Sequence, residues 1–382
     1  MGLAGAIGSA GVERLRVAVD ATPLLGQPTG VGAFVAGALA VLAGDASLEV
    51  SAYSLSVRGG GVLSGHLPPG VAGFCRPAPA AALFRAWGRL DTPPGRWWTG
   101  PADVVHGTNF VVPPSGGAAE VVTVHDLTPL RYPELSPAAT RVFPTLVRRA
   151  LGRGAWVHTP SAFVANEVID LLGADPDRVK AVHHGIPPEV GGGGAGVPGV
   201  GGPYVLALGT VEPRKGFPSL VRAFDALAAD HQDLRLVIAG PDGWGAEALT
   251  ESIQRAAHGS RVIRLGYVDA GRRTSLLRGA AAFAFPSVYE GFGLPPLEAM
   301  VAGVPVVAST AGALREVLGD GALLVAPNNH EALAEALVLV LDDESLRSAL
   351  VARGHAHAAR FSWEQCGAGI ASLYRRAAGR EG

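Results

Sequence analysis

Cysteine is scarce in this chain, since Cys75 and Cys366 are the only two among 382 residues. Because they lie far apart in the sequence, we expect neither a disulfide framework nor a cysteine-bound zinc site, and we expect the protein in the reducing cytoplasm. The histidines are scattered and never fall at the spacing of metal ligands. The sequence therefore predicts that no metal is bound.

Long apolar runs and a strong net charge are also absent. No run reaches the roughly 18 to 20 apolar residues of a membrane-spanning helix. Residues 1–13 lack the basic start and apolar middle of a signal peptide and are interpreted as a disordered leader. The net charge of −2 produces no field that would attract nucleic acid, so no nucleic-acid partner is expected.

Motifs of several other enzyme classes are missing. The chain has no nucleophile elbow and no Walker motif, and the absence of a dinucleotide fingerprint argues against an ordinary dehydrogenase. Lysine occurs only as Lys180 and Lys215, and arginine supplies the remaining positive charge. A GC-rich genome explains this bias, but the neighbours of Lys215 suggest a function for it.

What the chain does contain is a regular alternation of short β-branched runs with longer helical stretches. This alternation predicts an α/β fold with parallel sheets covered on both faces. The runs expected to form strands are Leu15–Thr22, Leu48–Leu55, Ala102–Thr108, Glu120–Asp126, Ala155–Ser161, Val179–Gly185, Tyr204–Thr210, Leu234–Gly240, Val262–Val268, Ala281–Ser287, Val304–Ser309 and Ala322–Ala326.

A stretch rich in glycine and proline, 188–203, divides the chain. It precedes a strand instead of following one, so a linker is favoured over a phosphate-binding loop. We therefore predict two α/β domains, 14–187 and 204–361, whose sheets enclose a cleft. The remaining segment, 362–382, is expected to form a helix capped by Ser362.

The segment 285–300 predicts a phosphate site. A buried strand is followed by a glycine-bearing loop and by Pro295 and Pro296, which suit the first turn of a helix. Such a helix would present its free N–H groups and positive dipole end at the carboxyl edge of the sheet. Glu290 in the loop is suited to binding sugar hydroxyls. Glu298, expected in the first helical turn, is equally explained as a partner of the helix dipole.

A second segment, 207–217, combines a strand that ends at Gly209 with two cations, Arg214 and Lys215, just before a helix. The planar fork of arginine and the mobile charge of lysine suit phosphate oxygens. The pair is therefore suited to neutralising a diphosphate leaving group, and a solvated surface pair is the alternative.

The first half of the chain carries weaker signals. The turn at Thr29-Gly30-Val31-Gly32 is explained by a tight turn as well as by a phosphate site. His106 and His125 each end a strand, where a structural histidine is the alternative to a functional one. Asp175-Pro176-Asp177 matches an acidic metal-binding motif, but acidic residues are routine in a proline-bearing turn.

Two basic stretches with apolar neighbours leave a peripheral contact with the inner face of the membrane open. Solvated helix faces and ordinary core packing are the alternative. The first stretch has Arg141, Arg148, Arg149 and Arg153 around Val142, Phe143, Leu146 and Val147, and the second has Trp87, Trp97 and Trp98 with Arg85, Arg89 and Arg96.

Taken together, these motifs resemble glycosyltransferase family 4. The resemblance rests on Glu-Pro-Arg-Lys-Gly at 212–216 and on Glu290 and Glu298 with seven residues between them. It extends to His125-Asp126-Leu127 and to the tail Ser362-Trp363-Glu364. It implies the GT-B fold, in which two Rossmann-like domains face each other across a cleft and a C-terminal helix crosses back to the first domain.

The resemblance also implies roles for individual residues. Arg214 and Lys215 would bind the donor diphosphate and stabilise its departure, and Glu290 would bind hydroxyls of the transferred sugar. Glu298 would hold the nucleotide ribose, and His125 would lie beside the sugar. The further donor-binding residues are Gly32 near the diphosphate, Tyr267 and Val268 against the nucleobase, and Gly209, Gly291, Phe292, Gly293 and Leu294.

The activity implied is a retaining, metal-independent transfer of a hexose from a nucleotide diphosphate sugar to a glycan, lipid or small-molecule acceptor. The run 125–130 is similar to that of mannosyltransferases and favours GDP-mannose over a UDP-sugar as the co-substrate. The acceptor stays open. A nucleotide-sugar epimerase of the same fold and a non-catalytic nucleotide-sugar-binding protein are the alternatives.

Overall fold

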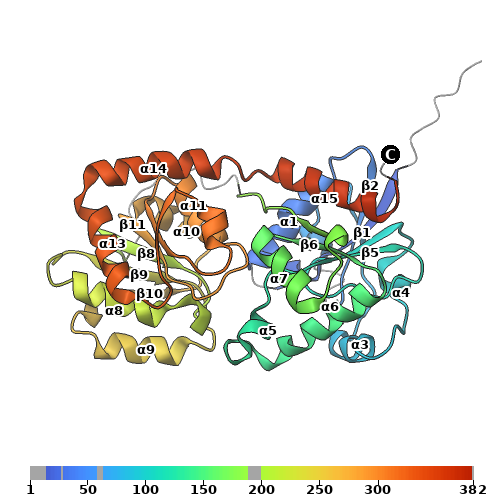
Figure 1. Cartoon of the computed structure of the whole chain (residues 1–382), viewed down its shortest axis with the longest axis horizontal. Helices are drawn as coiled ribbons and strands as arrows, with labels where there is room; N and C mark the ends of the chain where they lie inside the picture. The colour runs from blue at the N-terminus through green and yellow to red at the C-terminus, as the bar shows by residue number, and fades with distance from the viewer. Residues whose placement is uncertain (1–13, 27–28, 58–62, 188–198, 381–382) are drawn as a thin grey trace, which may run out of the picture. The chain divides into compact units, whose positions relative to one another are not determined.

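The computed structural model of the chain describes residues 14–26, 29–57, 63–187 and 199–380. The predicted leader, 1–13, and most of the predicted linker, 188–198, lie outside these residues. The chain forms two compact units: the first comprises 1–123, 149–156 and 367–382, and the second comprises 124–148 and 157–366. Figure 1 colours the chain from blue at the N-terminus to red at the C-terminus and labels many of its helices and strands.

The sheet of the N-terminal half has seven strands in the order β3-β2-β1-β4-β5-β6-β7. The pairs β1–β2, β1–β4, β2–β3, β4–β5 and β6–β7 are parallel. Because β1 lies between β2 and β4, the strand order reverses beside β1. The strands are β1 (Leu15–Asp20), β2 (Leu48–Tyr53), β3 (Ala72–Phe74), β4 (Val104–Gly107), β5 (Ala119–Thr123), β6 (Trp156–Thr159) and β7 (Val179–Ala181).

The sheet of the C-terminal half has six parallel strands in the order β10-β9-β8-β11-β12-β13. Its order reverses between β8 and β11, and open α/β sheets bind ligands at such a point, beyond the carboxyl ends of the strands. The strands are β8 (Tyr204–Leu208), β9 (Arg235–Ala239), β10 (Val262–Gly266), β11 (Ala282–Phe285), β12 (Val306–Ser309) and β13 (Ala322–Val325).

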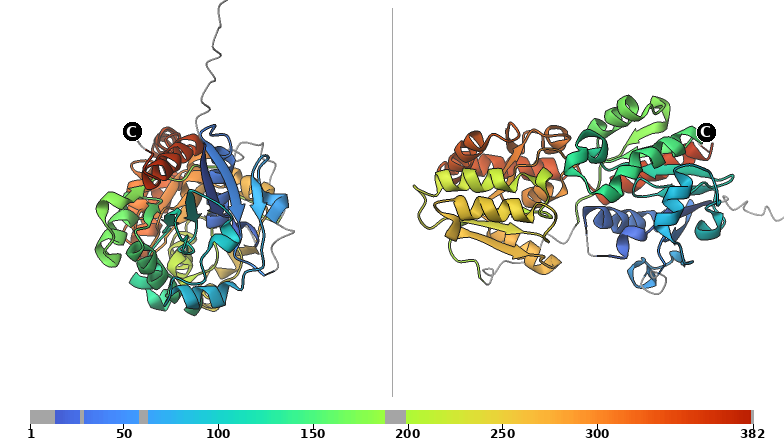
Figure 2. Two further views of the ribbon diagram at one scale, coloured as in Figure 1. Left: turned by 90° about the vertical axis from the view of Figure 1, so that its right-hand side faces the viewer. Right: turned by 90° about the horizontal axis from the view of Figure 1, so that it is seen from below.

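Helices cover both faces of this second sheet. Successive residues of a strand point to opposite faces, and in β8 Val205 and Ala207 join one apolar core while Leu206 and Leu208 join the other. The first core is closed by α8 (Phe217–Leu227), α9 (Ala246–Arg255) and α13 (His330–Asp342), and the second by α10 (Ala270–Gly279) and α11 (Leu294–Val301). The right panel of Figure 2 looks onto α8 and α9.

The remaining helices follow the strand–helix alternation that the sequence predicts. They are α1 (Gly30–Leu42), α3 (Ala80–Trp87), α4 (Arg96–Thr99), α5 (Thr128–Arg131), α6 (Phe143–Gly152), α7 (Ala162–Leu172), α12 (Leu314–Leu318), α14 (Glu344–Ala358) and α15 (Trp363–Ala377). Short 3-10 helices are η1 (Thr22–Leu24), η2 (Ser64–His66), η3 (Pro133–Leu135), η4 (Ala138–Val142), η5 (Pro176–Arg178), η7 (Pro213–Lys215) and η8 (Gly259–Arg261).

All twelve predicted strands are confirmed within a few residues at their ends, and β3 is the strand that the sequence analysis missed. This strand has only three residues, pairs with β2 and buries none of its side chains fully. It therefore lacks the apolar run by which the other strands were predicted.

The predicted terminal helix is confirmed as α15. Ser362 caps it, because its hydroxyl accepts a hydrogen bond from the N–H of Gln365 at 3.2 Å. The later part of α15 belongs to the first unit. There the Tyr374 hydroxyl bonds His106 Nδ1 at 2.7 Å, and Arg375 pairs with Asp45 at 3.1 Å. These contacts fasten the helix to the N-terminal sheet, as the family resemblance implies.

Candidate active site

Two loops of the second unit meet where its strand order reverses. The loop after β8 turns through η7, and the N–H of Val288, in the loop after β11, donates to the carbonyl oxygen of Arg214 at 2.8 Å. Gly216 lies between η7 and α8 with a positive φ of 67°. A Cβ there would lie 2.3 Å from the carbonyl oxygen of Pro286, so only glycine permits this approach.

The meeting of the loops places Arg214 and Lys215 on one carboxylate. Lys215 Nζ lies 2.6 Å from Glu290 Oε1, and Arg214 Nη1 lies 3.0 Å from Glu290 Oε2. Ser287 donates a further hydrogen bond to Oε1 at 2.7 Å, and Arg214 Nε donates to Glu212 at 2.8 Å. Lys215 and Glu290 are buried, so the alternative of a solvated surface pair is wrong.

The electrostatics of this cluster follow from burial and from the paired charges. Burial alone would raise the pKa of Glu290, but the charges of Lys215 and Arg214 outweigh it and lower the pKa to about 2. Burial and the neighbouring charge of Arg214 lower the pKa of Lys215. For Arg214 burial acts in the same sense, yet the carboxylates of Glu290 and Glu212 outweigh it and raise the pKa. A fixed carboxylate and two oriented cations result.

Helix α11 begins beside this cluster. Gly293 precedes its first residue with a φ of 106°, and Pro295 and Pro296 stand in the first turn, as predicted. Glu298 is the fifth residue of α11, so the expectation of a first-turn carboxylate is wrong. Arg273, from α10, pairs with the buried Glu298 carboxylate. A side-chain cation, and not the helix dipole, is therefore the partner of Glu298.

His125 lies against the loop after β11. A Cβ at Gly291 would lie 1.8 Å from the carbonyl oxygen of His125, so the absence of a side chain at 291 permits the contact. The Tyr289 hydroxyl accepts a hydrogen bond from the N–H of Leu127 at 2.9 Å and donates one to Glu167. The structure therefore brings His125 and Gly291 together and fixes both segments through Tyr289.

The other predicted donor-binding residues of the second unit differ in exposure. Tyr267 is exposed, while Val268 packs against the core that α10 and α11 close. Phe292 is buried, with its ring centroid 4.9 Å from that of His184, and Leu294 packs partly against the same core. Of Phe292 only the backbone is left for a ligand. Gly209 has a φ of 150°, and a Cβ there would lie 3.4 Å from Lys215 Cε.

Gly32 belongs to the first unit, where it stands in the first turn of α1. The Thr29 hydroxyl accepts a hydrogen bond from the N–H of Gly32 at 3.1 Å and so caps the helix. A Cβ at Gly32 would lie 3.1 Å from the carbonyl oxygen of Pro23. The segment 29–32 is therefore a helix N-terminus, and its interpretation as a tight turn is wrong.

Four residues of the site were missed by sequence analysis: Ser287, Tyr289, Arg273 and Glu167. Ser287 and Tyr289 lie inside the segment 285–300 that the sequence singled out, but their partners are 3 and 122 residues away. Arg273 and Glu167 lie on helices where an arginine or glutamate is ordinary. Nothing in the sequence marks them, because only the packing of the strands brings them to the loops.

Comparisons with known proteins identify the family of the chain. The family model described as glycosyl transferases group 1 matches residues 198–357, and the model described as Glycosyltransferase Family 4 matches residues 45–190. The O-antigen chain mannosyltransferase B of Escherichia coli is 33% identical over 288 residues, which cover 71% of this chain and 74% of that protein. The chain belongs to glycosyltransferase family 4.

Solved structures agree on the fold of this family 4 enzyme. The sucrose-phosphate synthase of Thermosynechococcus elongatus gives a TM-score of 0.73 at 21% identity. The alignment covers 95% of this chain and 99% of the synthase chain. Anabaena HepE in complex with UDP-glucose gives a TM-score of 0.72 at 18% identity. The alignment covers 94% of this chain and 99% of the HepE chain. These comparisons confirm the predicted GT-B architecture of two Rossmann-like domains, and the family confirms the prediction of a hexosyltransferase.

Two weaker candidates of the sequence analysis have structural roles in this glycosyltransferase. His106 is buried between the Tyr374 hydroxyl and the Thr123 hydroxyl, each 2.7 Å from a ring nitrogen. It is a structural histidine. Asp175 accepts a hydrogen bond from the N–H of Asp177 at 3.0 Å and opens η5, so the turn interpretation of Asp175-Pro176-Asp177 is confirmed.

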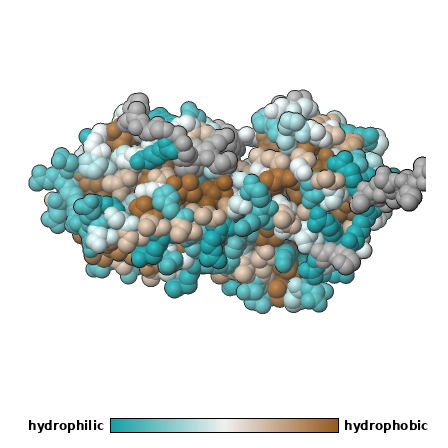
Figure 3. All heavy atoms as spheres, turned by 90° about the horizontal axis from the view of Figure 1, so that it is seen from above, coloured by the Kyte–Doolittle hydropathy of each residue, from teal (hydrophilic) through white to brown (hydrophobic). Residues whose placement is uncertain are grey.

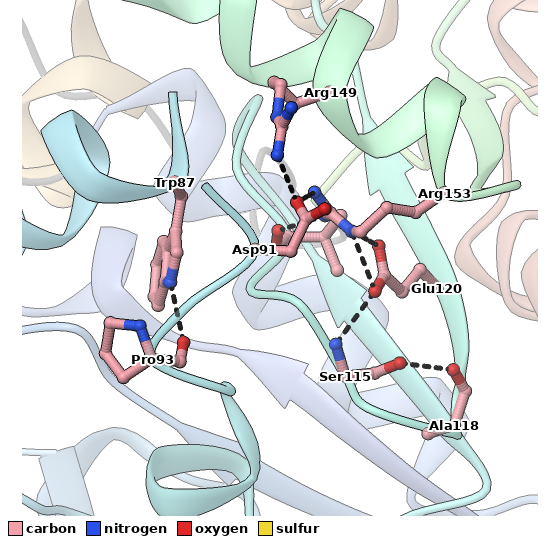
Figure 4. A network of polar contacts seen from close by, with 9 residues as sticks. Trp87, Asp91, Pro93, Ser115, Ala118, Glu120, Arg149 and Arg153 are labelled. Carbon is pink, nitrogen blue, oxygen red and sulfur yellow. Dashed lines mark hydrogen bonds and ion pairs between the residues drawn. The ribbon is translucent and has the colours of Figure 1, made fainter. Parts of the chain in front are cut away.

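Two of the arginines proposed for a membrane surface, Arg149 and Arg153, make ion pairs within the protein. Figure 4 shows Arg149 and Arg153 on Asp91, at 2.8 and 3.1 Å, with Arg153 also 2.7 Å from Glu120. Trp87 is buried and donates to the Pro93 carbonyl oxygen at 2.9 Å. Core packing is therefore confirmed for Trp87, as it is for the buried Trp98, whereas Trp97 is 63% exposed.

The surface itself is mixed in character. On the face shown in Figure 3, hydrophobic and hydrophilic residues are interspersed. Across residues 14–26, 29–57, 63–187 and 199–380, no helix has both the length and the apolar character needed to cross a membrane. Peripheral contact through the basic stretches stays a prediction.

Proposed function

We propose that this glycosyltransferase moves a hexose from a nucleotide diphosphate sugar to an acceptor with retention of the anomeric configuration. The observation that carries the proposal is the pair Arg214 and Lys215, held on Glu290 beside the N-terminus of α11. Breaking a glycosyl–phosphate bond builds negative charge on the diphosphate. Two oriented cations and a helix N-terminus stabilise that charge.

The same cluster supplies the charge compensation that a metal ion supplies in other transferases, so we propose a metal-independent reaction. Arg214 and Lys215 would exchange part of their contact with Glu290 for phosphate oxygens. Glu290 would then accept hydrogen bonds from hydroxyls of the sugar. His125 would lie beside that sugar, since its backbone contacts Gly291 in the same loop as Glu290.

The remaining donor contacts follow the elements that approach the cluster. Glu298 would bind the ribose hydroxyls, and the exposed Tyr267 with Val268 would lie against the nucleobase. The backbone around Gly209, Gly291, Phe292, Gly293 and Leu294 would surround the diphosphate, and the backbone of Gly32 is proposed as a further diphosphate contact. Retention would follow from attack on the face that the leaving phosphate vacates, with that phosphate accepting the acceptor's proton.

GDP-mannose is the favoured donor. The run 125–130 supports it, and so does the similarity to a mannosyltransferase. A UDP-sugar is the alternative, because a structural neighbour binds UDP-glucose. A thermal-shift screen of GDP-mannose and UDP-sugars, confirmed by calorimetry, would decide between them.

A transfer assay tests the function. The protein would be incubated with the donor selected by that screen and with lipid, glycan and small-molecule acceptor pools. We expect nucleoside diphosphate to be released in proportion to the acceptor glycosylated, and NMR to show the donor's anomeric configuration in the product. Epimerised donor without release would indicate the epimerase alternative, and tight binding without turnover a binding protein. Inverted product would refute retention.

A further inference from the structure

The proposed reaction gives Glu298 a role but does not explain why this carboxylate pairs with Arg273. Glu298 is 5% exposed. A carboxylate at this depth is costly unless a charge or hydrogen bonds compensate it. Arg273 of α10 provides that compensation by donating from Nη2 to Glu298 Oε2. Within the described residues, Glu298 has no other hydrogen-bonding side chain.

The pairing engages only one side of the carboxylate. Oε2 accepts a hydrogen bond from Arg273. No hydrogen bond among the described residues involves Oε1, so this oxygen is available to other donors. The backbone of Arg273 is fixed in the first turn of α10, where its N–H donates to the carbonyl oxygen of Asp269 at 2.8 Å. Asp269 follows directly on Tyr267 and Val268. The helix that carries Arg273 therefore starts beside the segment proposed to meet the nucleobase.

We propose that Arg273 is a positioning residue for the nucleotide, which holds one oxygen of Glu298 and keeps this carboxylate charged so that the other oxygen accepts hydrogen bonds from the ribose hydroxyls. This proposal rests on the proposed function, since it takes Glu298 as the ribose-binding residue. It adds a second residue, on a different helix, on which donor affinity depends. A charged carboxylate is the stronger acceptor for a diol, because charge-assisted hydrogen bonds exceed neutral ones.

The groups around Glu298 decide how the proposal responds to pH. Burial raises the pKa of Glu298, and Arg273 opposes that rise. Strands β11 and β12, which pack on α11, carry no titratable side chain. On α14, the His355 side chain lies at Gly303, beyond the last residue of α11. Removing the charge of Arg273 would therefore raise the pKa of Glu298 further and favour its protonated form.

The test is nucleotide binding by calorimetry, with GDP and UDP as probes, for the wild type and for Arg273→Met between pH 6 and pH 8.5. We expect affinity in Arg273→Met to fall about tenfold or more at pH 6.5 and to recover as the pH rises and Glu298 ionises. Arg273→Lys keeps the charge and should stay close to the wild type. Arg278→Met removes a different arginine from α10 and is the matched control.

Nucleotides that lack the ribose hydroxyls make the test specific. For 2′,3′-dideoxy-GDP or 2′,3′-dideoxy-UDP, wild type and Arg273→Met should bind equally, and in a Glu298→Gln background Arg273→Met should have little further effect. Equal loss with the dideoxy probes, a pH-independent loss, or tighter binding by Arg273→Met would overturn the proposal. If Arg273→Met does not fold, Arg273→Lys and Glu298→Gln with both probe types still decide it. Wild-type protein that binds neither nucleotide would instead refute the proposed function.

Discussion

Three buried carboxyl groups of this molecule have different charged surroundings. Glu290 lies on two cations, and its pKa is lowered to about 2. Glu298 has one cation, and burial raises its pKa in spite of Arg273. The carboxyl group of Asp20, at the end of β1, accepts hydrogen bonds from Thr22 alone among the described residues, and burial raises its pKa to about 6.

Burial raises the pKa of all three carboxyl groups. The number of paired cations therefore decides whether the net shift of the pKa is downward or upward. Lys215 and Arg214 are therefore what makes the loop after β11 permanently charged. A glutamate in that loop with one cation would resemble Glu298. With none, it would resemble Asp20 and lose its charge near pH 6.

The largest effect is expected from removing one of the two cations. Lys215→Ala should lower kcat about 100- to 1000-fold, because a charge that meets the leaving diphosphate is lost. Lys180→Ala removes the only other lysine, which is exposed, and is the matched control. The measurement is initial-rate nucleoside diphosphate release with circular dichroism as a check on folding. Near-normal turnover in a folded Lys215→Ala protein would contradict the assignment.

The opposite pKa shifts of Glu290 and Glu298 predict opposite pH trends in stability. The pKa of Glu290 is lowered, so its ionised form stabilises the fold above about pH 4.5, and this contribution, about 3 kcal/mol, is lost as the pH falls toward 2. The pKa of Glu298 is raised, so its contribution is full below about pH 4.5 and declines as the pH rises.

Urea unfolding of the wild type, Glu290→Gln and Glu298→Gln between pH 3 and pH 7 measures both trends. The advantage of the wild type over Glu290→Gln should shrink toward low pH. Its advantage over Glu298→Gln should shrink toward high pH. Parallel trends for the two variants would show that the paired cations do not control these groups.

Asp20 extends the comparison to a carboxyl group without a cation. Its folded pKa of about 6 lies above the ordinary 3.8, so its contribution to stability is full below about pH 4 and is lost as the pH rises through 6. Asp20→Asn should therefore gain about 2 to 3 kcal/mol over the wild type between pH 4 and pH 8. Chemical denaturation at both pH values checks this, and a pH-independent difference would show that burial does not raise the pKa of Asp20.

The smallest effect is expected from removing a neutral hydrogen-bonding group, the hydroxyl of Tyr289. Tyr289→Phe removes a hydroxyl that bonds Leu127 and Glu167, so it should cost about 1 to 2 kcal/mol of stability at every pH. Tyr132→Phe, whose ring centroid lies 5.4 Å from that of Tyr289, is the control. Equal thermal denaturation midpoints for both variants would show that the hydroxyl of Tyr289 does not fasten the two segments.

Much of this arrangement was predictable from local signals. The apolar runs indicate the strands, and Pro295 and Pro296 after a glycine-bearing loop indicate where α11 begins. The position of a residue along a helix is harder to predict from such signals, as the placement of Glu298 beyond the first turn of α11 shows. The ion pairs could not be predicted, because Lys215 and Glu290 are 75 residues apart and meet only where β8 and β11 become neighbours. Arg273 is ordinary in the sequence and becomes informative only through the packing of α10 on α11.

The central claim is that the cluster of Arg214, Lys215 and Glu290 binds the donor diphosphate. A crystal structure with GDP or UDP bound tests it most directly. We predict diphosphate oxygens within hydrogen-bonding distance of Arg214 and Lys215 and of the first N–H groups of α11, with the ribose hydroxyls on Glu298. A nucleotide bound elsewhere, with both cations still paired to Glu290 alone, would contradict the account.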